Sequence, residues 1–208
     1  MAILFSFLAA NLVSGEAQWI SGKHYTTLVP PVTVGSGQDL VVTEFFWYGC
    51  GHCFAFEPML TAWGKRLPAG VALKPSPAVW NDPMQMHAKA FYVAQVLEQT
   101  DVLHQSIFNA MNLERRRLVS RLAIRDLFEE NGVDPERFDN IFDSFGVNSQ
   151  VRLADARAKS AKITGTPSML VAGKYLIDTK SAGSQATMLE IASYLIEKEL
   201  ATRQPQEY

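Results

Sequence analysis

The 208-residue chain contains two cysteines, and both belong to a single motif, Cys50-Gly51-His52-Cys53. A disulfide that only braces a fold normally closes a long loop, because in the chain-entropy model its stabilising effect grows with loop length. A gap of two residues closes almost nothing. We therefore expect the two sulfur atoms to carry chemistry, either thiol–disulfide exchange or metal binding.

The residues around the motif predict where the thiols lie. Residues 40–48, LVVTEFFWY, are a nearly continuous run of β-branched, aliphatic and aromatic residues, which predicts a buried strand. Residues 50–67 have the pattern of a helix, with a kink expected at Pro58. Cys50 is therefore expected at the first turn of this helix, where unpaired N–H groups and the helix dipole favour a thiolate.

This position suggests different roles for the two cysteines. We expect the Cys50 sulfur to face solvent, where the backbone N–H groups of His52 and Cys53 stabilise negative charge, so Cys50 is the predicted nucleophile. Cys53 is predicted to be shielded and to resolve the mixed disulfide that Cys50 forms. The His52 imidazole either donates to the sulfur or, when charged, disfavours its protonation. A lowered thiol pKa stabilises the dithiol form and so favours an oxidant.

Glu44 interrupts the apolar strand. An acid at such a position carries a desolvation penalty unless it is paired or protonated, so its pKa is expected to rise. One interpretation makes Glu44 a buried proton acceptor beneath the cysteines, which takes the proton of Cys53 when the mixed disulfide is resolved. The alternative is an edge-facing side chain with a route to solvent.

Other uses of the cysteine pair find less support. Zinc would need a second pair of ligands at comparable spacing, which the remaining histidines do not supply. A c-type haem would need a histidine directly after Cys53, where Phe54 stands. We expect no metal and no cofactor, while an iron–sulfur cluster shared across a dimer and a purely structural disulfide stay as alternatives. The remaining histidines are His24, His87 and His104.

A second candidate element is Gly165-Thr166-Pro167, which precedes an apolar run. Proline at the start of a strand removes a ladder N–H, so a special role for Pro167 is expected. A cis peptide bond between Thr166 and Pro167 is one hypothesis, although most bonds that precede proline are trans.

Length and composition describe a globular protein with a sizeable core. Hydrophobic residues make up 48% of the chain, charged residues 19%, and the formal net charge is −2, which argues against a disordered or nucleic-acid-binding protein. The densest basic cluster, residues 114–117, is predicted to lie on a solvated helix face.

The order of predicted elements indicates an α/β fold with a helical middle. A short strand at residues 71–73 and a loop at 75–77 follow the first helix, and residues 82–146 are predicted to be helical. The apolar stripe in the second half of this region consists of Phe138, Ile141, Phe142 and Phe145.

The last quarter of the chain predicts a helix at residues 149–162 and a hairpin turning at Ala172-Gly173. A final helix is capped by Ser184. We therefore divide the chain into the first part of an α/β domain at 18–81, a helical insertion at 82–147 and the second part of that domain at 148–208.

Residues 1–17 begin with an apolar stretch that is shorter than the roughly 20 residues needed to span a bilayer. This stretch resembles the apolar region of a signal peptide, with cleavage predicted before Gln18 and export of the remainder. No Lys or Arg precedes Lys23, so the usual positive region is missing. Retention of the segment as an anchor or a packed arm is the alternative.

The combination of motifs resembles the DsbA-type thiol oxidases of the bacterial periplasm. The resemblance is carried by GKHYTTL, VTEFFWYGCGHCFAFEP and TGTPSMLVAGKY, and by the helical region between the last two. It implies a thioredoxin fold in which a helical domain is inserted between a βαβ half and a ββα half. It further implies that Glu44 is the buried acid, and that Gly165, Thr166 and a cis Pro167 line a peptide groove beside Cys50.

The resemblance also implies partners. The substrates would be reduced, unfolded exported proteins, and a DsbB-type quinone-linked membrane protein would reoxidise the dithiol, with no nucleic acid or metal involved. The chain departs from the best-known pattern at Gly51, where proline is usual, and at Thr166, where valine is more familiar. Because residues between the cysteines tune the potential, an isomerase or reductase of the same fold is an alternative, as is a non-catalytic peptide-binding module.

Overall fold

A five-stranded sheet forms the centre of the computed structural model, which describes residues 18–34 and 39–203. The strand order is β1-β5-β4-β2-β3; β2 and β3 are parallel, and the other neighbouring pairs are antiparallel. Strand β3 therefore forms one edge of the sheet. The strands are β1 Thr26–Thr27, β2 Leu40–Phe46, β3 Val71–Pro77, β4 Ser168–Val171 and β5 Tyr175–Asp178.

Most of the helices lie in the chain between β3 and β4, so they separate the first three strands from the last two. One helix follows β2, five lie between β3 and β4, and two follow β5 in the described part of the chain. Their bounds are α1 Gly51–Gly64, α2 Asp82–Val96, α3 Thr100–Asn112, α4 Arg121–Glu130, α5 Pro135–Phe142, α6 Phe145–Ser160, α7 Thr179–Ala182 and α8 Gln185–Arg203. This order agrees with the fold expected from the resemblance.

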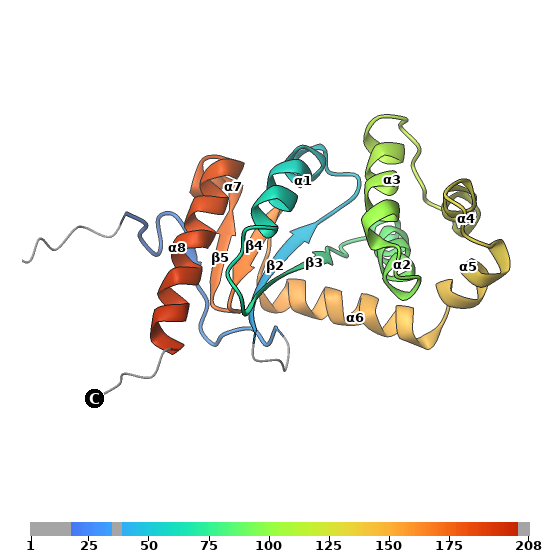
Figure 1. The fold of residues 1–208 in the computed structure, drawn as a ribbon. Coiled ribbons are helices and arrows are strands. Elements are labelled where there is room, and N and C mark those ends of the chain that lie inside the picture. The colour runs from blue at the N-terminus through green and yellow to red at the C-terminus, as the bar shows by residue number, and fades with distance from the viewer. Residues whose placement is uncertain (1–17, 35–38, 204–208) are drawn as a thin grey trace, which may run out of the picture.

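Strand β2 is buried along its whole length, as its apolar sequence predicts. Because side chains alternate between the two faces of a strand, Leu40, Val42 and Glu44 share one face, and Val41 and Phe45 share the other. Helices α1 and α8 cover the first face, and α6 packs against the second (Figure 1). Glu44 consequently points toward α1, the helix that begins beside Cys50.

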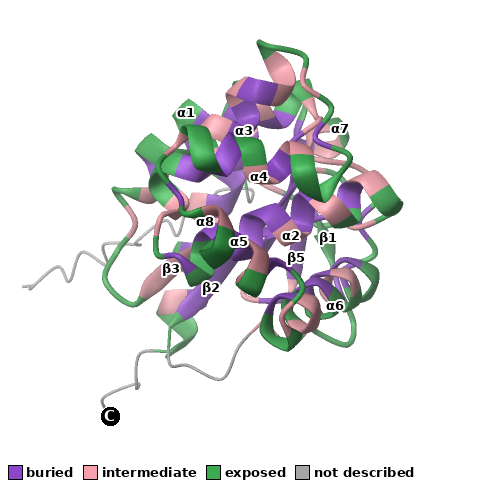
Figure 2. Ribbon diagram, turned by 90° about the vertical axis from the view of Figure 1, so that its right-hand side faces the viewer, coloured by how far each residue is buried: buried purple, intermediate pink, exposed green. Residues whose placement is uncertain are grey.

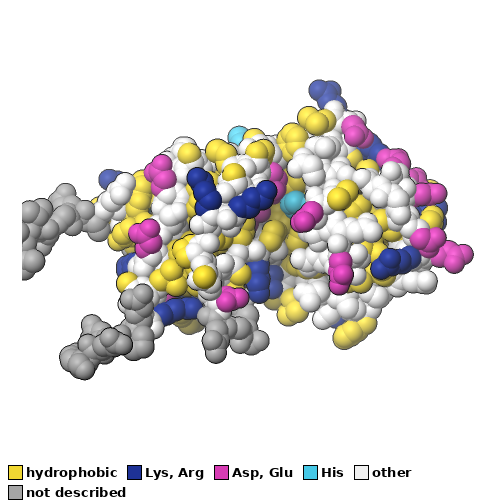
Figure 3. Space-filling view, in the orientation of Figure 1, with side chains coloured by type: hydrophobic (Ala, Val, Ile, Leu, Met, Phe, Trp, Pro, Cys, Tyr) yellow, Lys and Arg dark blue, Asp and Glu magenta, His cyan; other side chains and the backbone are white. Residues whose placement is uncertain are grey.

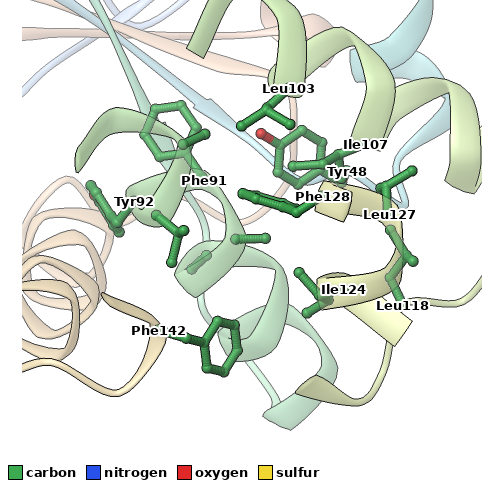
Figure 4. Close-up of a cluster of buried hydrophobic side chains, with 14 of the residues drawn as sticks. Tyr48, Phe91, Tyr92, Leu103, Ile107, Leu118, Ile124, Leu127, Phe128 and Phe142 are labelled. Atoms are coloured by element: carbon green, nitrogen blue, oxygen red, sulfur yellow. The ribbon is translucent and has the colours of Figure 1, made fainter. Parts of the chain in front are cut away.

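The helices α2–α5 form a separate layer beside the sheet, with an aromatic core of their own (Figure 1). Figure 4 shows Phe91 from α2, Phe128 from α4 and Phe142 near the end of α5 directed into this core. Tyr48, from the turn between β2 and α1, lies in the same core and is fully buried. The insertion therefore packs directly against the residues that precede the cysteines.

Burial follows the expected faces of most helices (Figure 2). In α8 one face formed by Met188, Ile191, Ala192 and Leu195 is fully buried. As predicted, Ser184 caps the helix through its hydroxyl, which accepts the Thr187 N–H at 3.0 Å. Charged side chains of both signs are interspersed over the surface seen in Figure 3. This mixture agrees with the small net charge.

The loop predicted at residues 75–77 is wrong, because these residues continue β3. Pro75 pairs in register with Glu44, and Pro77 with Phe46. Proline is tolerated in an edge strand, where a missing N–H leaves no neighbouring strand unpaired. The sequence pattern alone does not reveal that β3 lies at the edge.

Two predictions for the helical region are also wrong. Phe145 does not extend the stripe of α5, because α5 ends at Phe142 and the Ser144 hydroxyl caps a new helix by accepting the Val147 N–H. Phe145 is consequently 82% exposed. The basic cluster at residues 114–117 lies in the loop between α3 and α4 and not on a helix face.

Smaller differences concern the ends of elements. The strand predicted to reach residue 48 ends at Phe46, and the helix predicted to reach residue 67 ends at Gly64 with Pro58 inside it. The Asn81 side chain caps α2 by accepting the Met84 N–H. The predicted domain boundary at 147/148 falls within α6, and the division of the chain into domains stays a prediction.

The predicted signal peptide, residues 1–17, lies outside the described residues. Within residues 18–34 and 39–203, no helix combines the length and apolar character needed to cross a membrane.

Two phenylalanines of the insertion provide a matched test of this packing. Phe138 is fully buried, whereas Phe145 is 82% exposed. Phe138→Ala should lower the free energy of unfolding by about 3–5 kcal/mol, because it leaves a cavity in the aromatic core. Phe145→Ala should change it by less than about 1 kcal/mol. Urea denaturation measures both values, and equal effects would contradict the packing described here.

Candidate active site

Cys50 occupies the N-cap of α1, with an extended backbone at φ −92° and ψ 108°. Its Sγ accepts a hydrogen bond from the Cys53 backbone N–H at 3.3 Å and lies 3.3 Å from the Thr166 carbonyl oxygen, to which the thiol donates. The sulfur thus lies between the first turn of α1 and the segment that leads into β4. Cys50 is partly exposed, and both cysteines carry free thiols.

The surroundings of the Cys50 sulfur favour its anion. A hydrogen bond with the Cys53 thiol lowers the pKa of Cys50 from 9.0 to about 5, and the Thr166 side chain and the N–H groups of Cys53 and His52 act in the same direction. Partial burial works against this shift without cancelling it. A thiolate at the first turn of a helix is the state that the sequence predicted.

Cys53 has the opposite character, although it is only one helical turn away. Its side chain is fully buried, and this burial raises the thiol pKa well above its ordinary value. The charges of Cys50 and Glu44 raise it further. The motif therefore pairs a sulfur that is readily ionised with one that holds its proton, in the arrangement predicted from their helix positions.

Glu44 lies on the face of β2 that α1 covers and has no exposed surface. Neither carboxyl oxygen has a hydrogen-bond partner in the described part of the chain. Desolvation raises the pKa of Glu44 well above its ordinary value, and the charges of Glu57 and Cys50 add to this effect. The side chain is therefore a buried carboxyl group near both cysteines that holds its proton more strongly than an ordinary glutamate, and the alternative of an edge-facing acid with a solvent route is wrong.

A second set of polar side chains lies behind Cys53 and was missed in the sequence. The Tyr48 hydroxyl lies 2.7 Å from Nδ1 of His104, whose Nε2 lies 3.3 Å from Oε1 of Glu57. Tyr48 is fully buried and Glu57 is 8% exposed. The spacing of Glu57 four residues after Cys53 was a usable signal, since it places both side chains on one face of α1. Nothing in the sequence pointed to His104.

The two residues between the cysteines contribute through their backbone. The His52 side chain is exposed, and its imidazole makes no hydrogen bond to another residue within 18–34 and 39–203. Its carbonyl oxygen accepts from Nε2 of Gln185 at 2.6 Å. A Cβ on Gly51 would meet only Oδ1 of Asn112, at 3.9 Å, so glycine is not a steric requirement here.

The segment Gly165-Thr166-Pro167 lies against Cys50, as the resemblance implied. The bond between Thr166 and Pro167 is cis. The Gly165 carbonyl oxygen accepts the Ser168 hydroxyl at 2.8 Å, which fixes the start of β4. Thr166 is partly exposed beside the sulfur, so this wall of the site is accessible from the surface.

Metal binding would require several ligand side chains close together. No cluster of three or more His, Cys, Asp or Glu side chains that could hold an ion lies within residues 18–34 and 39–203. His24 precedes β1, His87 lies on α2 and His104 lies on α3. Each makes hydrogen bonds to protein groups.

A stabilised thiolate beside a buried thiol, in a fold of this topology, is suited to thiol–disulfide exchange with the cysteines of another protein. Fold and site together therefore define a thiol:disulfide oxidoreductase of the thioredoxin type.

Comparison with known proteins leads to the same class. A model of the DSBA-like thioredoxin domain matches residues 63–190. The thiol:disulfide interchange protein DsbA of Pseudomonas aeruginosa is 36% identical over 203 residues, which cover 96% of both chains. The chain belongs to the DsbA-like thioredoxin domain family, and it is a disulfide-forming thiol:disulfide oxidoreductase.

Solved structures extend the likeness to the whole fold. The crystal structure of Pseudomonas aeruginosa DsbA superposes with a TM-score of 0.84 at 36% identity, covering 88% of this chain and 96% of that one. The oxidoreductase DsbA from Xylella fastidiosa gives 0.82 at 27% identity, covering 88% and 98%. The thioredoxin fold with its helical insertion is thereby confirmed.

The acidity of Cys50 is directly measurable. The ultraviolet absorbance of the thiolate should titrate with a midpoint near pH 5 in the dithiol protein and be absent near neutral pH in Cys50→Ser. Because the folded pKa lies below the unfolded value of 9.0, ionisation stabilises the folded dithiol form fully above pH 9. This stabilisation should be lost as the pH falls through about 5. A midpoint near that of a free cysteine would contradict the site described here.

Proposed function

We propose that the chain oxidises reduced, unfolded exported proteins by passing them the disulfide formed by Cys50 and Cys53. The observation that carries the proposal is the contrast in acidity between the two sulfur atoms. Since the folded protein stabilises the Cys50 thiolate, the dithiol form is favoured and the disulfide is readily given away.

The exchange proceeds in two steps. A substrate thiolate attacks the Cys50 sulfur, the bond between Cys50 and Cys53 breaks, and Cys53 leaves as a thiolate that takes a proton. A second substrate thiolate then attacks the substrate sulfur of the mixed disulfide and releases the Cys50 thiolate. The substrate gains a disulfide, and its two electrons reside on the reduced cysteine pair.

We propose Glu44 as the group that supplies and removes the Cys53 proton. Its carboxyl is buried, its pKa is raised, and its charge influences the acidity of Cys53. When Cys53 leaves as a thiolate, the carboxylic acid form of Glu44 gives it a proton and becomes a carboxylate. In the opposite direction, in which Cys53 attacks a mixed disulfide, the carboxylate form of Glu44 takes up the Cys53 proton. The His52 imidazole adds positive charge near the Cys50 sulfur when it is protonated.

The substrate groove is proposed at Gly165, Thr166 and Pro167. The Thr166 carbonyl oxygen contacts the Cys50 sulfur at 3.3 Å, so an extended chain whose sulfur reaches Cys50 must pass this wall. The N-terminal sequence and the family support export to the periplasm, and we propose a DsbB-type membrane protein as the reoxidant.

The redox equilibrium with glutathione tests the direction of the reaction. The oxidised protein should be reduced by far lower ratios of reduced to oxidised glutathione than thioredoxin requires, and it should oxidise a dithiol peptide to its disulfide. A potential near that of thioredoxin, about −270 mV, would identify a reductase and overturn the proposal.

Two serine variants provide the controls for this assay. Cys50→Ser should abolish peptide oxidation, because the attacked sulfur is lost. Cys53→Ser should instead accumulate mixed disulfides, visible by mass spectrometry. Cys50 can still form a disulfide with another sulfur, but the Cys53 thiol that would break this bond is missing. Full activity in either variant would contradict the assigned roles.

Glu44→Gln tests the buried acid. This change keeps the shape of the side chain but removes the proton acceptor, so Cys53 should resolve a mixed disulfide at least about 10-fold more slowly near neutral pH. Stopped-flow measurement with a glutathione mixed disulfide gives the rate. Glu136→Gln, at an exposed position on α5, serves as the matched control. Unchanged kinetics in Glu44→Gln would remove the proposed role.

A further inference from the structure

A basic cavity borders the turn before the cysteine motif and takes no part in the exchange chemistry. Its volume is about 370 Å³. Its walls come from the turn before Cys50, the end of α3 and residues 113–119, which we call the arginine loop. The lining includes Trp47, Gly49, Met111, Arg115, Arg117 and Val119.

The cavity is fastened to the turn that carries the nucleophile. Gly49 lines it and immediately precedes Cys50, whose backbone N–H donates to the Trp47 carbonyl oxygen at 2.9 Å. At the end of α3, Nδ2 of Asn112 donates to the Tyr48 carbonyl oxygen at 2.8 Å. Figure 1 shows the connection from β2 to α1 lying next to α3. A chain bound through its sulfur at Cys50 therefore has this cavity within a few residues.

The arginine loop has a defined conformation. Arg116 forms a forked pair with Glu130 at 2.6 and 3.1 Å, and Leu118 is 2% exposed. Buried His87 joins the loop to the active-site turn: its Nδ1 accepts from Nε1 of Trp47 at 2.9 Å, and its Nε2 lies 3.0 Å from the Arg117 carbonyl oxygen. A loop held at these points presents its free side chains in fixed positions, which lowers the entropic cost of binding.

The free side chains of the loop are positive. Arg115 and Arg117 are exposed, and neither has an acidic partner within the part of the chain that the structure describes. Their neighbour Arg116 is already neutralised by Glu130 and, at 3.6 Å, by Glu114. The cavity thus combines an aromatic wall at Trp47 with two unpaired guanidinium groups, a combination suited to carboxylates on a polypeptide.

We propose that this cavity binds an acidic segment of the substrate polypeptide next to the cysteine that exchanges with Cys50. The proposal rests on the proposed function and narrows its substrate class: among reduced proteins, chains with Asp or Glu near the reacting cysteine are oxidised faster. Arg115 and Arg117 pair with these carboxylates, and apolar parts of the segment contact Trp47 and Met111.

Three dithiol peptides of equal length test the preference, with glutamate, serine or lysine flanking the first cysteine. With oxidised wild-type protein at low ionic strength, kcat/KM should be about 3- to 10-fold higher for the glutamate peptide than for the lysine peptide. The preference should shrink as salt is added. The double variant Arg115→Glu, Arg117→Glu should reverse it while leaving the serine peptide unchanged.

Arg66→Glu is the matched control, because this arginine is exposed, follows the C-terminal end of α1 and does not line the cavity. It should leave the glutamate preference in place. Equal rates for the glutamate and lysine peptides with wild-type protein, or an equal loss of preference in Arg66→Glu, would overturn the inference. Failure to oxidise even the serine peptide would instead contradict the proposed function, so the two failures are distinguishable.

Discussion

The placement of one sulfur atom at the start of a helix is the constraint on which the rest of the site depends. The anion of Cys50 is stabilised because α1 begins at Gly51, which brings the Cys53 thiol and the N–H groups of the first turn to the Cys50 sulfur. That helix start is fixed in turn by the buried strand β2, which ends at Phe46 and leaves a short turn before the motif. The sheet, the turn and the first helical turn therefore act as one unit.

The insertion is part of this unit and not an appendage to it. Tyr48 and Cys53 lie in the same aromatic core as the side chains of α2–α5. Asn112, at the end of α3, holds the backbone of the turn through the Tyr48 carbonyl oxygen. His104, also on α3, connects Tyr48 to Glu57 on α1. The helical layer thus holds the turn before Cys50 through the aromatic core and through the hydrogen bonds of Asn112 and His104.

Much of the fold and the central chemistry could be predicted from local sequence. The apolar run of β2, the Cys-Gly-His-Cys motif and Glu44 each carry a local signal, because burial and helix position follow from neighbouring residues. Contacts between distant segments left no such signal: Tyr48 meets His104 only after α3 packs on the turn. Edge position is another tertiary property, and without it the local pattern around Pro75 and Pro77 predicts a loop.

The same prolines also limit backbone pairing at the edge of the sheet. A strand at the margin of a sheet is a template onto which an unfolded chain can add through backbone hydrogen bonds. Proline offers no N–H for such addition, and β3 carries Pro75 and Pro77 along that margin. The disulfide-forming oxidoreductase is in this way protected from backbone pairing between β3 and another polypeptide.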